Sequence, residues 1–154
     1  MPYVPACSPK STVGKSGNWT FTKNGCNQNV TITWDKGVAD ETYSIGISKT
    51  AGADPGPKPD TDNRSWTFYD IKPGKWYINI KAGQTCGWGD VYYWRVDVPS
   101  VEPTLNIYED IISETNRELH INSQCASSVT ISPSAGYIKP GNSILKLLPK
   151  KDVF

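Results

Sequence analysis

The sequence consists largely of short runs in which apolar or aromatic residues alternate with polar ones, and turn-forming residues separate the runs. Successive side chains of an extended strand point to opposite faces of a sheet, so this alternation indicates half-buried β-strands. Segments rich in Gly and Pro, such as 52–59 and 72–74, would break a helix proposed across them. We therefore predict an all-β fold. The runs in the first part of the chain are 18–23, 28–34, 42–48, 65–69, 75–82 and 91–98.

Four of these runs gather apolar residues on one face, as strands do when one side of a sheet is buried. Two sheets that pack such faces together form a β-sandwich, which is the architecture we expect. The four predicted faces are Val30, Ile32 and Trp34; Tyr43, Ile45 and Ile47; Trp76, Ile78, Ile80 and Ala82; and Trp94, Val96 and Val98.

The distribution of large residues predicts two folded segments. All six Trp lie before residue 100, whereas every Leu lies after it. Two separate cores explain this split, with Pro99 and Pro103 flanking a short stiff linker. We expect an N-terminal extension (1–16), a sandwich (17–99), a linker (100–103) and a smaller β domain (104–154).

The smaller domain has four strand-like runs, at 104–108, 118–122, 128–132 and 143–148, and residues 109–117 have room for one helical turn. A sheet of this size is marginal by itself. We expect it to pack against the first domain, to pair with another chain, or to be part of something larger.

Charge and hydropathy exclude several functions. The 154 residues carry 16 basic and 15 acidic side chains, a net charge of +1, which gives no electrostatic reason to expect a nucleic-acid partner. No apolar run approaches the roughly 18 to 20 residues that span a bilayer, so we expect no membrane insertion. The N-terminus lacks the basic and apolar regions of a signal peptide, so we do not expect export by the usual route.

The four cysteines are Cys7, Cys26, Cys86 and Cys125. No two have the two-residue spacing of a zinc knuckle, so we do not expect zinc bound by cysteine. Two interpretations stay open from the spacing alone. The cysteines form two disulfides if the protein meets an oxidising compartment, or they are buried thiols if it does not.

The sequence offers few candidate catalytic groups. The single histidine, His120, alternates with Leu119 and Ile121, so we expect a solvent-exposed strand position and not a general base. One histidine cannot form a His-pair metal site, and a conventional catalytic triad has no other histidine to use. We predict that the protein is not an enzyme and needs no cofactor.

We expect no metal site. Asp60, Asp62 and Asn63 could offer oxygen ligands to calcium, but this segment lacks the Gly and the distal Glu of an EF-hand. Ordinary turn formation is the preferred interpretation of these residues.

Two aromatic residues are candidate binding residues. Trp88 lies in a Gly-flanked loop, and Tyr93 lies on the strand face opposite Trp94. If exposed, they could stack on sugar rings or anchor a protein partner. The competing interpretation, which we prefer for Trp88, is that its ring packs back over the end of the sandwich.

Six segments, taken in order, carry a likeness to a known family: 30–34, 65–68, 71–74, 76–82, 87–89 and 93–96. In this order they resemble strand B, strand E, the E–F corner, strand F, the F–G turn and strand G of a fibronectin type III domain of the kind found in bacterial surface proteins. The resemblance covers about residues 28–98 and implies a seven-stranded, immunoglobulin-like sandwich. The family usually has a Tyr entering strand F whose hydroxyl bonds back to the E–F corner. Here the inward residue is Trp76, with Tyr77 facing outward, and an indole N–H could replace that donor.

The resemblance also implies how the cysteines pair. In this fold the A–B turn, which carries Cys26, and the F–G loop, which carries Cys86, lie at opposite ends of the strands, roughly 23 Å apart. A disulfide needs Cα atoms within about 7 Å, so these two cannot pair. Cys7 precedes strand A near the F–G end, and strand G delivers the second segment to the A–B end. The implied disulfides are Cys7–Cys86 and Cys26–Cys125.

In the second segment, residues 128–141 resemble the turn-rich middle of immunoglobulin-like domains of the major sperm protein type. This likeness implies a small or partial immunoglobulin-like β domain and no activity.

These expectations favour a non-catalytic structural and interaction module on an outer surface, such as an adhesion or spacer part of a cell-surface or secreted protein. Its partners would be other proteins or further copies of itself. Two alternatives stay open. A virion structural protein, such as a capsid decoration or tail component, would combine a surface-type fold with the lack of an export signal. A carbohydrate-binding module that assists an enzyme would use Trp88 and Tyr93 to bind glycan.

Overall fold

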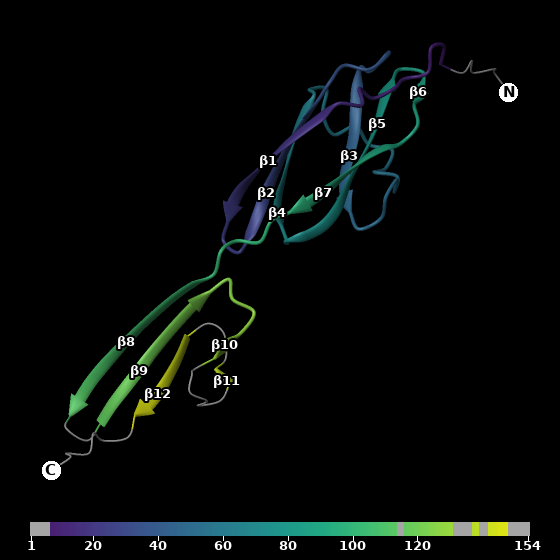
Figure 1. Cartoon of the computed structure of the whole chain (residues 1–154). Helices are drawn as coiled ribbons and strands as arrows, with labels where there is room; N and C mark the ends of the chain where they lie inside the picture. Colours follow the sequence, from purple (N-terminus) through teal and green to yellow (C-terminus); the bar gives the residue numbers. More distant parts are fainter. Residues whose placement is uncertain (1–6, 114–115, 131–136, 139–141, 148–154) are drawn as a thin grey trace. The chain divides into compact units, whose positions relative to one another are not determined.

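The structure is a computed structural model that describes residues 7–113, 116–130, 137–138 and 142–147 (Figure 1). The chain divides into two units, Met1–Ser100 and Val101–Phe154. The division falls at the start of the predicted linker, 100–103. The described residues contain antiparallel sheets and no helix, so the all-β prediction is confirmed.

The first unit contains two sheets (Figure 1). In the first sheet, three antiparallel strands follow the order β1-β2-β4. Gly25 and Cys26 connect β1 to β2, and Gly25 adopts a φ of 61°, which a residue without a Cβ reaches at little cost. These strands are β1 (Gly17–Asn24), β2 (Asn27–Trp34) and β4 (Ser65–Ile71).

In the second sheet, β5 is the central strand. It pairs with β3 along one edge, and with β7 and the short β6 along the other. Its strands are β3 (Thr42–Ser48), β5 (Gly74–Gln84), β6 (Gly87–Trp88) and β7 (Tyr92–Val98). The six predicted runs of this unit therefore all form strands, and β6 adds a seventh of only two residues.

The apolar faces of the two sheets meet in one core. Val30, Ile32, Ile78, Ile80 and Val96 are fully buried, as the alternation predicts. Trp34 of the first sheet meets Tyr43 of the second edge to face, with ring centroids 5.0 Å apart. An aromatic pair of this kind contributes about 0.5–1.5 kcal/mol beyond the burial of its area. This packing makes the first unit a β-sandwich.

The corner before β5 has the indole bond that the sequence analysis considered. The indole N–H of Trp76 donates to the carbonyl oxygen of Lys72 at 2.8 Å. The indole thus ties the start of β5 to the corner that precedes it. Above the same ring, Lys49 Nζ lies 3.8 Å from the ring centroid, a cation–π contact.

Several polar side chains on the outer face of the second sheet are buried, because residues 49–60 lie across them. Asn79 points outward from β5 yet is only 2 % exposed. Its Oδ1 accepts from Gly52 N at 2.8 Å, and its Nδ2 donates to Thr50 O at 3.2 Å and to Ser48 Oγ at 3.1 Å. One buried amide therefore holds the start of the covering loop.

Two more buried polar side chains fix the rest of this loop. Ser44 Oγ donates to Gly56 O at 2.9 Å. Lys81 Nζ lies 2.8 Å from Asp54 Oδ1, and the Lys81 side chain is only 8 % exposed. The hydrogen bond from Lys81 holds the pKa of Asp54 below its ordinary value. A buried ammonium needs such a partner, so the ion pair stabilises the loop in this position.

A buried tyrosine of β3 is hydrogen-bonded to a carboxylate that precedes the strand. The Tyr43 hydroxyl donates to Asp40 Oδ2, which also accepts from Gly37 N at 2.8 Å. Burial raises the pKa of Tyr43 to about 12, and the bond to Asp40 adds to the rise. Burial would raise the pKa of Asp40 as well, but its hydrogen bonds outweigh that effect and hold its pKa below the ordinary value.

The second unit contains a three-stranded antiparallel sheet in the order β12-β9-β8 and a pairing of β10 with β11 (Figure 1). Residues 109–113 lie in β8 and residues 116–117 in β9, so the helical turn considered for 109–117 was wrong for the part that is described. Predicted strand residues 131, 132 and 148 lie outside the described residues. The strands are β8 (Thr104–Ser113), β9 (Asn116–Gln124), β10 (Val129–Thr130), β11 (Tyr137–Ile138) and β12 (Asn142–Leu147).

Replacing the buried amide of the covering loop should destabilise the first unit. We expect Asn79→Ala to lower the free energy of unfolding by about 1–3 kcal/mol, because it leaves buried backbone groups of the loop without partners. Urea unfolding followed by Trp fluorescence measures this change. Asn18→Ala, at an exposed position of β1, is the matched control and should change stability by less than about 0.5 kcal/mol. Equal losses in the two variants would contradict the anchoring role.

The raised pKa of Tyr43 predicts a specific loss of stability in alkali. The neutral hydroxyl is favoured in the folded state, so its contribution is fully present below the unfolded pKa of 10.0 and is lost as the pH rises toward about 12. Between pH 9 and pH 11 the wild type should lose about 1.4 kcal/mol more than Tyr43→Phe. Urea unfolding at the two pH values measures the difference. Tyr69→Phe, an exposed tyrosine, should follow the wild type, and parallel curves for Tyr43→Phe and wild type would contradict the prediction.

Candidate functional site

The N-terminal segment is fastened to the sandwich by a disulfide. Cys7 and Cys86 are joined, with Cα atoms 5.4 Å apart, so this part of the predicted pairing is confirmed. Gln84 Nε2 donates to Pro9 O at 2.8 Å, close to the bridge. Ser11 and Val13 are buried. Residues 7–16, expected as an extension, therefore include part of the packed first unit.

The other two cysteines belong to different units. Cys26 lies in the turn between β1 and β2, and Cys125 follows β9. The pairing of Cys26 with Cys125 stays a prediction.

Trp88 packs onto β5. A Cβ atom added to Gly83 would lie 2.5 Å from the Trp88 ring, so the ring rests directly on the glycine. Lys81 Nζ lies 5.1 Å from the centroid of the same ring. This geometry agrees with the packing interpretation and leaves Trp88 poorly suited to serve as an open platform.

Tyr93 is the more accessible of the two aromatic candidates. It is 47 % exposed and meets Tyr77 edge to face, with centroids 5.7 Å apart. Tyr93 pairs with Asn79, whereas Trp88 pairs with Gly83. Four positions along β5 correspond to about 13 Å. The structure therefore does not bring the two predicted binding residues together.

The calcium candidates lie where the chain passes the edge of β3. Asp60 Oδ2 accepts from Ile45 N at 2.9 Å, and Asp60 N donates to Tyr43 O at 2.8 Å. Asn63 N donates to Thr61 Oγ1 at 3.0 Å. Asp60 thus continues the backbone pairing of the sheet, and this role accounts for its carboxylate without an ion. Asp62 is exposed.

A hollow of about 370 Å³ lies along β4, the edge strand of the first sheet. Its most accessible aromatic residue, Tyr69, is 71 % exposed. The hydroxyl of Thr67 is hydrogen-bonded to that of Thr31, with 2.9 Å between the two oxygens. Outward-facing hydroxyls on β4 were a signal in the sequence that we did not use. The lining residues carry no charge and are Thr61, Asn63, Ser65, Trp66, Thr67 and Tyr69.

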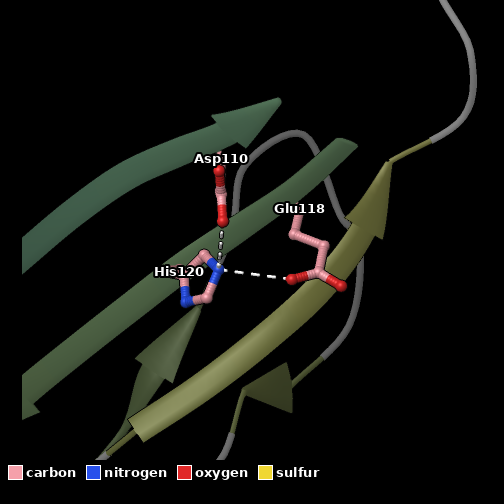
Figure 2. Close-up of side chains that lie close together, drawn as sticks. All are labelled: Asp110, Glu118 and His120. Carbon is pink, nitrogen blue, oxygen red and sulfur yellow. Dashed lines mark ion pairs between the residues drawn. The ribbon is translucent and has the colours of Figure 1, made fainter. Parts of the chain in front are cut away.

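Two carboxylates and the histidine gather on the sheet of the second unit (Figure 2). Asp110 on β8 is the cross-strand partner of Glu118 on β9, and His120 follows Glu118 on the same face. His120 Nε2 lies 3.3 Å from Glu118 Oε2 and 3.9 Å from Asp110 Oδ2. Figure 2 shows both carboxylates directed at this one ring nitrogen. We call these three residues the carboxylate–histidine cluster.

The imidazole of His120 is held in place by its cross-strand neighbour. Tyr108 stacks on the ring, with centroids 4.6 Å apart and an interplanar angle of 8°. The His120 side chain is 21 % exposed, and its Nε2 is closed off from solvent and makes no hydrogen bond. The predicted strand face is right, but the solvent-exposed description of His120 was wrong, because Tyr108 and the two carboxylates cover the ring.

No family model and no curated protein matches this chain. Among the residues that the structure describes, no helix is long and apolar enough to cross a membrane. The findings define the class of the molecule as an all-β protein whose first unit is a disulfide-fastened sandwich.

Proposed function

We propose that the protein is a non-catalytic structural and interaction module that works outside the reducing cytoplasm, on a cell surface or in secreted form. The disulfide between Cys7 and Cys86 carries this proposal. Disulfides form and persist in oxidising environments and are rare where glutathione and thioredoxin keep thiols reduced. The bridge also favours this location over a capsid or tail component folded in a reducing cytoplasm.

A fibronectin type III identity for the first unit is part of the proposal. The sheet orders β1-β2-β4 and β3-β5-β7 support it, since they equal the A-B-E and C-F-G orders of that family. The Trp76 bond to the corner at Lys72 supports it as well. Modules of this kind present edge strands and loops to other proteins, which suits an adhesion or spacer role.

The state of the Cys7–Cys86 disulfide in cells tests the proposed location, and its removal tests its contribution to stability. Intact source cells are treated with iodoacetamide before lysis, and the protein is mapped by mass spectrometry without reduction. We expect a cross-linked peptide pair that contains Cys7 and Cys86, both unalkylated. The free energy of unfolding of the Cys7→Ser, Cys86→Ser double variant should be about 2–5 kcal/mol lower than that of the oxidised protein.

The reduced wild-type protein is the control and should be at least as destabilised as the double variant, because reduction opens every disulfide of the chain. Alkylation of both Cys7 and Cys86 in intact cells would show that the protein resides in a reducing compartment and would overturn the proposed location.

Glycan binding is the second candidate function, and the hollow along β4 favours it. Its lining combines hydroxyl and amide groups with two aromatic residues and has no charge. Hydroxyls and amides can bond to sugar hydroxyls, and an exposed aromatic ring can stack on the apolar face of a sugar. The binding residues would then be Trp66 and Tyr69 in place of Trp88 and Tyr93.

Binding to immobilised neutral polysaccharides tests the second candidate. We expect Tyr69→Ala to weaken retention about two- to tenfold, since aromatic stacking is worth about 0.5–1.5 kcal/mol. Tyr93→Ala is the matched control, a similarly exposed tyrosine on the other sheet, and should bind like the wild type. Absence of retention across a panel of polysaccharides, or loss in Tyr93→Ala alone, would reject the hollow as a glycan site.

A further inference from the structure

We propose that the carboxylate–histidine cluster, Asp110, Glu118 and His120, binds a divalent transition-metal ion of the zinc type. The three ligand atoms lie within 4.8 Å of one another. This inference concerns the second unit and is independent of the structural and interaction role proposed above.

The donor set suits zinc in chemistry and in charge. Imidazole nitrogen and carboxylate oxygen are both ordinary zinc ligands, whereas calcium and magnesium prefer oxygen alone. Two carboxylates with a neutral imidazole carry two negative charges, which balance a divalent cation. Three protein ligands would leave a fourth position for water or for a group from a partner.

The distances already approach those of a bound ion. Two ligand atoms that each lie about 2.1 Å from a tetrahedral zinc are about 3.4 Å apart. His120 Nε2 is 3.3 Å from Glu118 Oε2 and 3.9 Å from Asp110 Oδ2. The Asp110 side chain is 54 % exposed, so it can rotate inward without disturbing a core.

A plain ion pair explains the cluster less well than a metal does. One ring nitrogen carries at most one proton and can serve one acceptor well, yet two carboxylates converge on Nε2. That nitrogen is closed off from solvent and makes no hydrogen bond. A cation bound to Nε2 and to both carboxylates would satisfy all three groups at once.

The scaffold holds the ligands in advance. Tyr108 fixes the ring plane, and Asp110 and Glu118 come from directly paired positions of β8 and β9. Ligands on neighbouring strands of a sheet are positioned more accurately than ligands on loops. Little reorganisation is therefore needed when an ion binds.

Zinc titration of the full chain, without an affinity tag and after alkylation of any thiols, tests the proposal. The chain contains one histidine, so NMR signals of a histidine ring report on His120 alone. We expect zinc chloride to shift the His120 ring signals with one-to-one stoichiometry in calorimetry. His120→Ala and Glu118→Gln should each weaken zinc binding at least tenfold, and calcium chloride should produce no shift.

Glu102→Gln, an exposed carboxylate of the same unit, is the matched control and should bind zinc like the wild type. Circular dichroism identifies any variant that fails to fold, and Asp110→Asn, which keeps the side-chain shape, provides a further variant. Unchanged His120 signals at millimolar zinc, or wild-type affinity in His120→Ala, would overturn the site.

Discussion

The first unit depends on the burial of alternating apolar side chains between two sheets. Val30 and Ile32 from one sheet and Ile78, Ile80 and Val96 from the other are removed completely from water. At about 25 cal/mol for each Å² of apolar surface, this burial is the main favourable term in folding. Because side chains alternate strictly along a strand, the same contacts fix the register of β2 and β5 and decide which residues reach the surface.

Polar contacts outside the hydrophobic core hold the covering loop on the surface of this sandwich. Asn79, Ser44 and Lys81 occupy outward positions, yet each is buried because the loop of residues 49–60 lies over them. The Cys7–Cys86 bridge secures the N-terminal segment in a different way, by restricting the unfolded chain. The loop therefore covers outward positions of β3 and β5, whereas those of β7 stay exposed, and the hollow along β4 lies on the other sheet.

Much of the fold could be predicted from the sequence, because alternation is a local signal. The six runs of the first unit and the faces of Val30 and Ile32 follow from it directly. The burial of Asn79 could not be predicted, since it depends on where a Gly- and Pro-rich loop comes to rest. The cluster of Asp110, Glu118 and His120 was missed for a related reason. The spacing of Glu118 and His120 was visible, but the register that sets Asp110 opposite Glu118 is a long-range property of the β8–β9 pair.

Both candidate sites lie on strand surfaces outside the buried cores. Tyr69 lies on the edge strand β4, and His120 lies on the polar face of β9, opposite the face of the buried Ile121. Substitutions at such positions remove little apolar contact, so they leave the core intact. The convergence of two carboxylates on one imidazole adds nothing to a hydrophobic core, and like charges held together cost stability unless a cation compensates them. Lys146, the cross-strand partner of Glu118 on β12, places one positive charge at a register position beside the cluster, and a bound cation would compensate the second carboxylate as well.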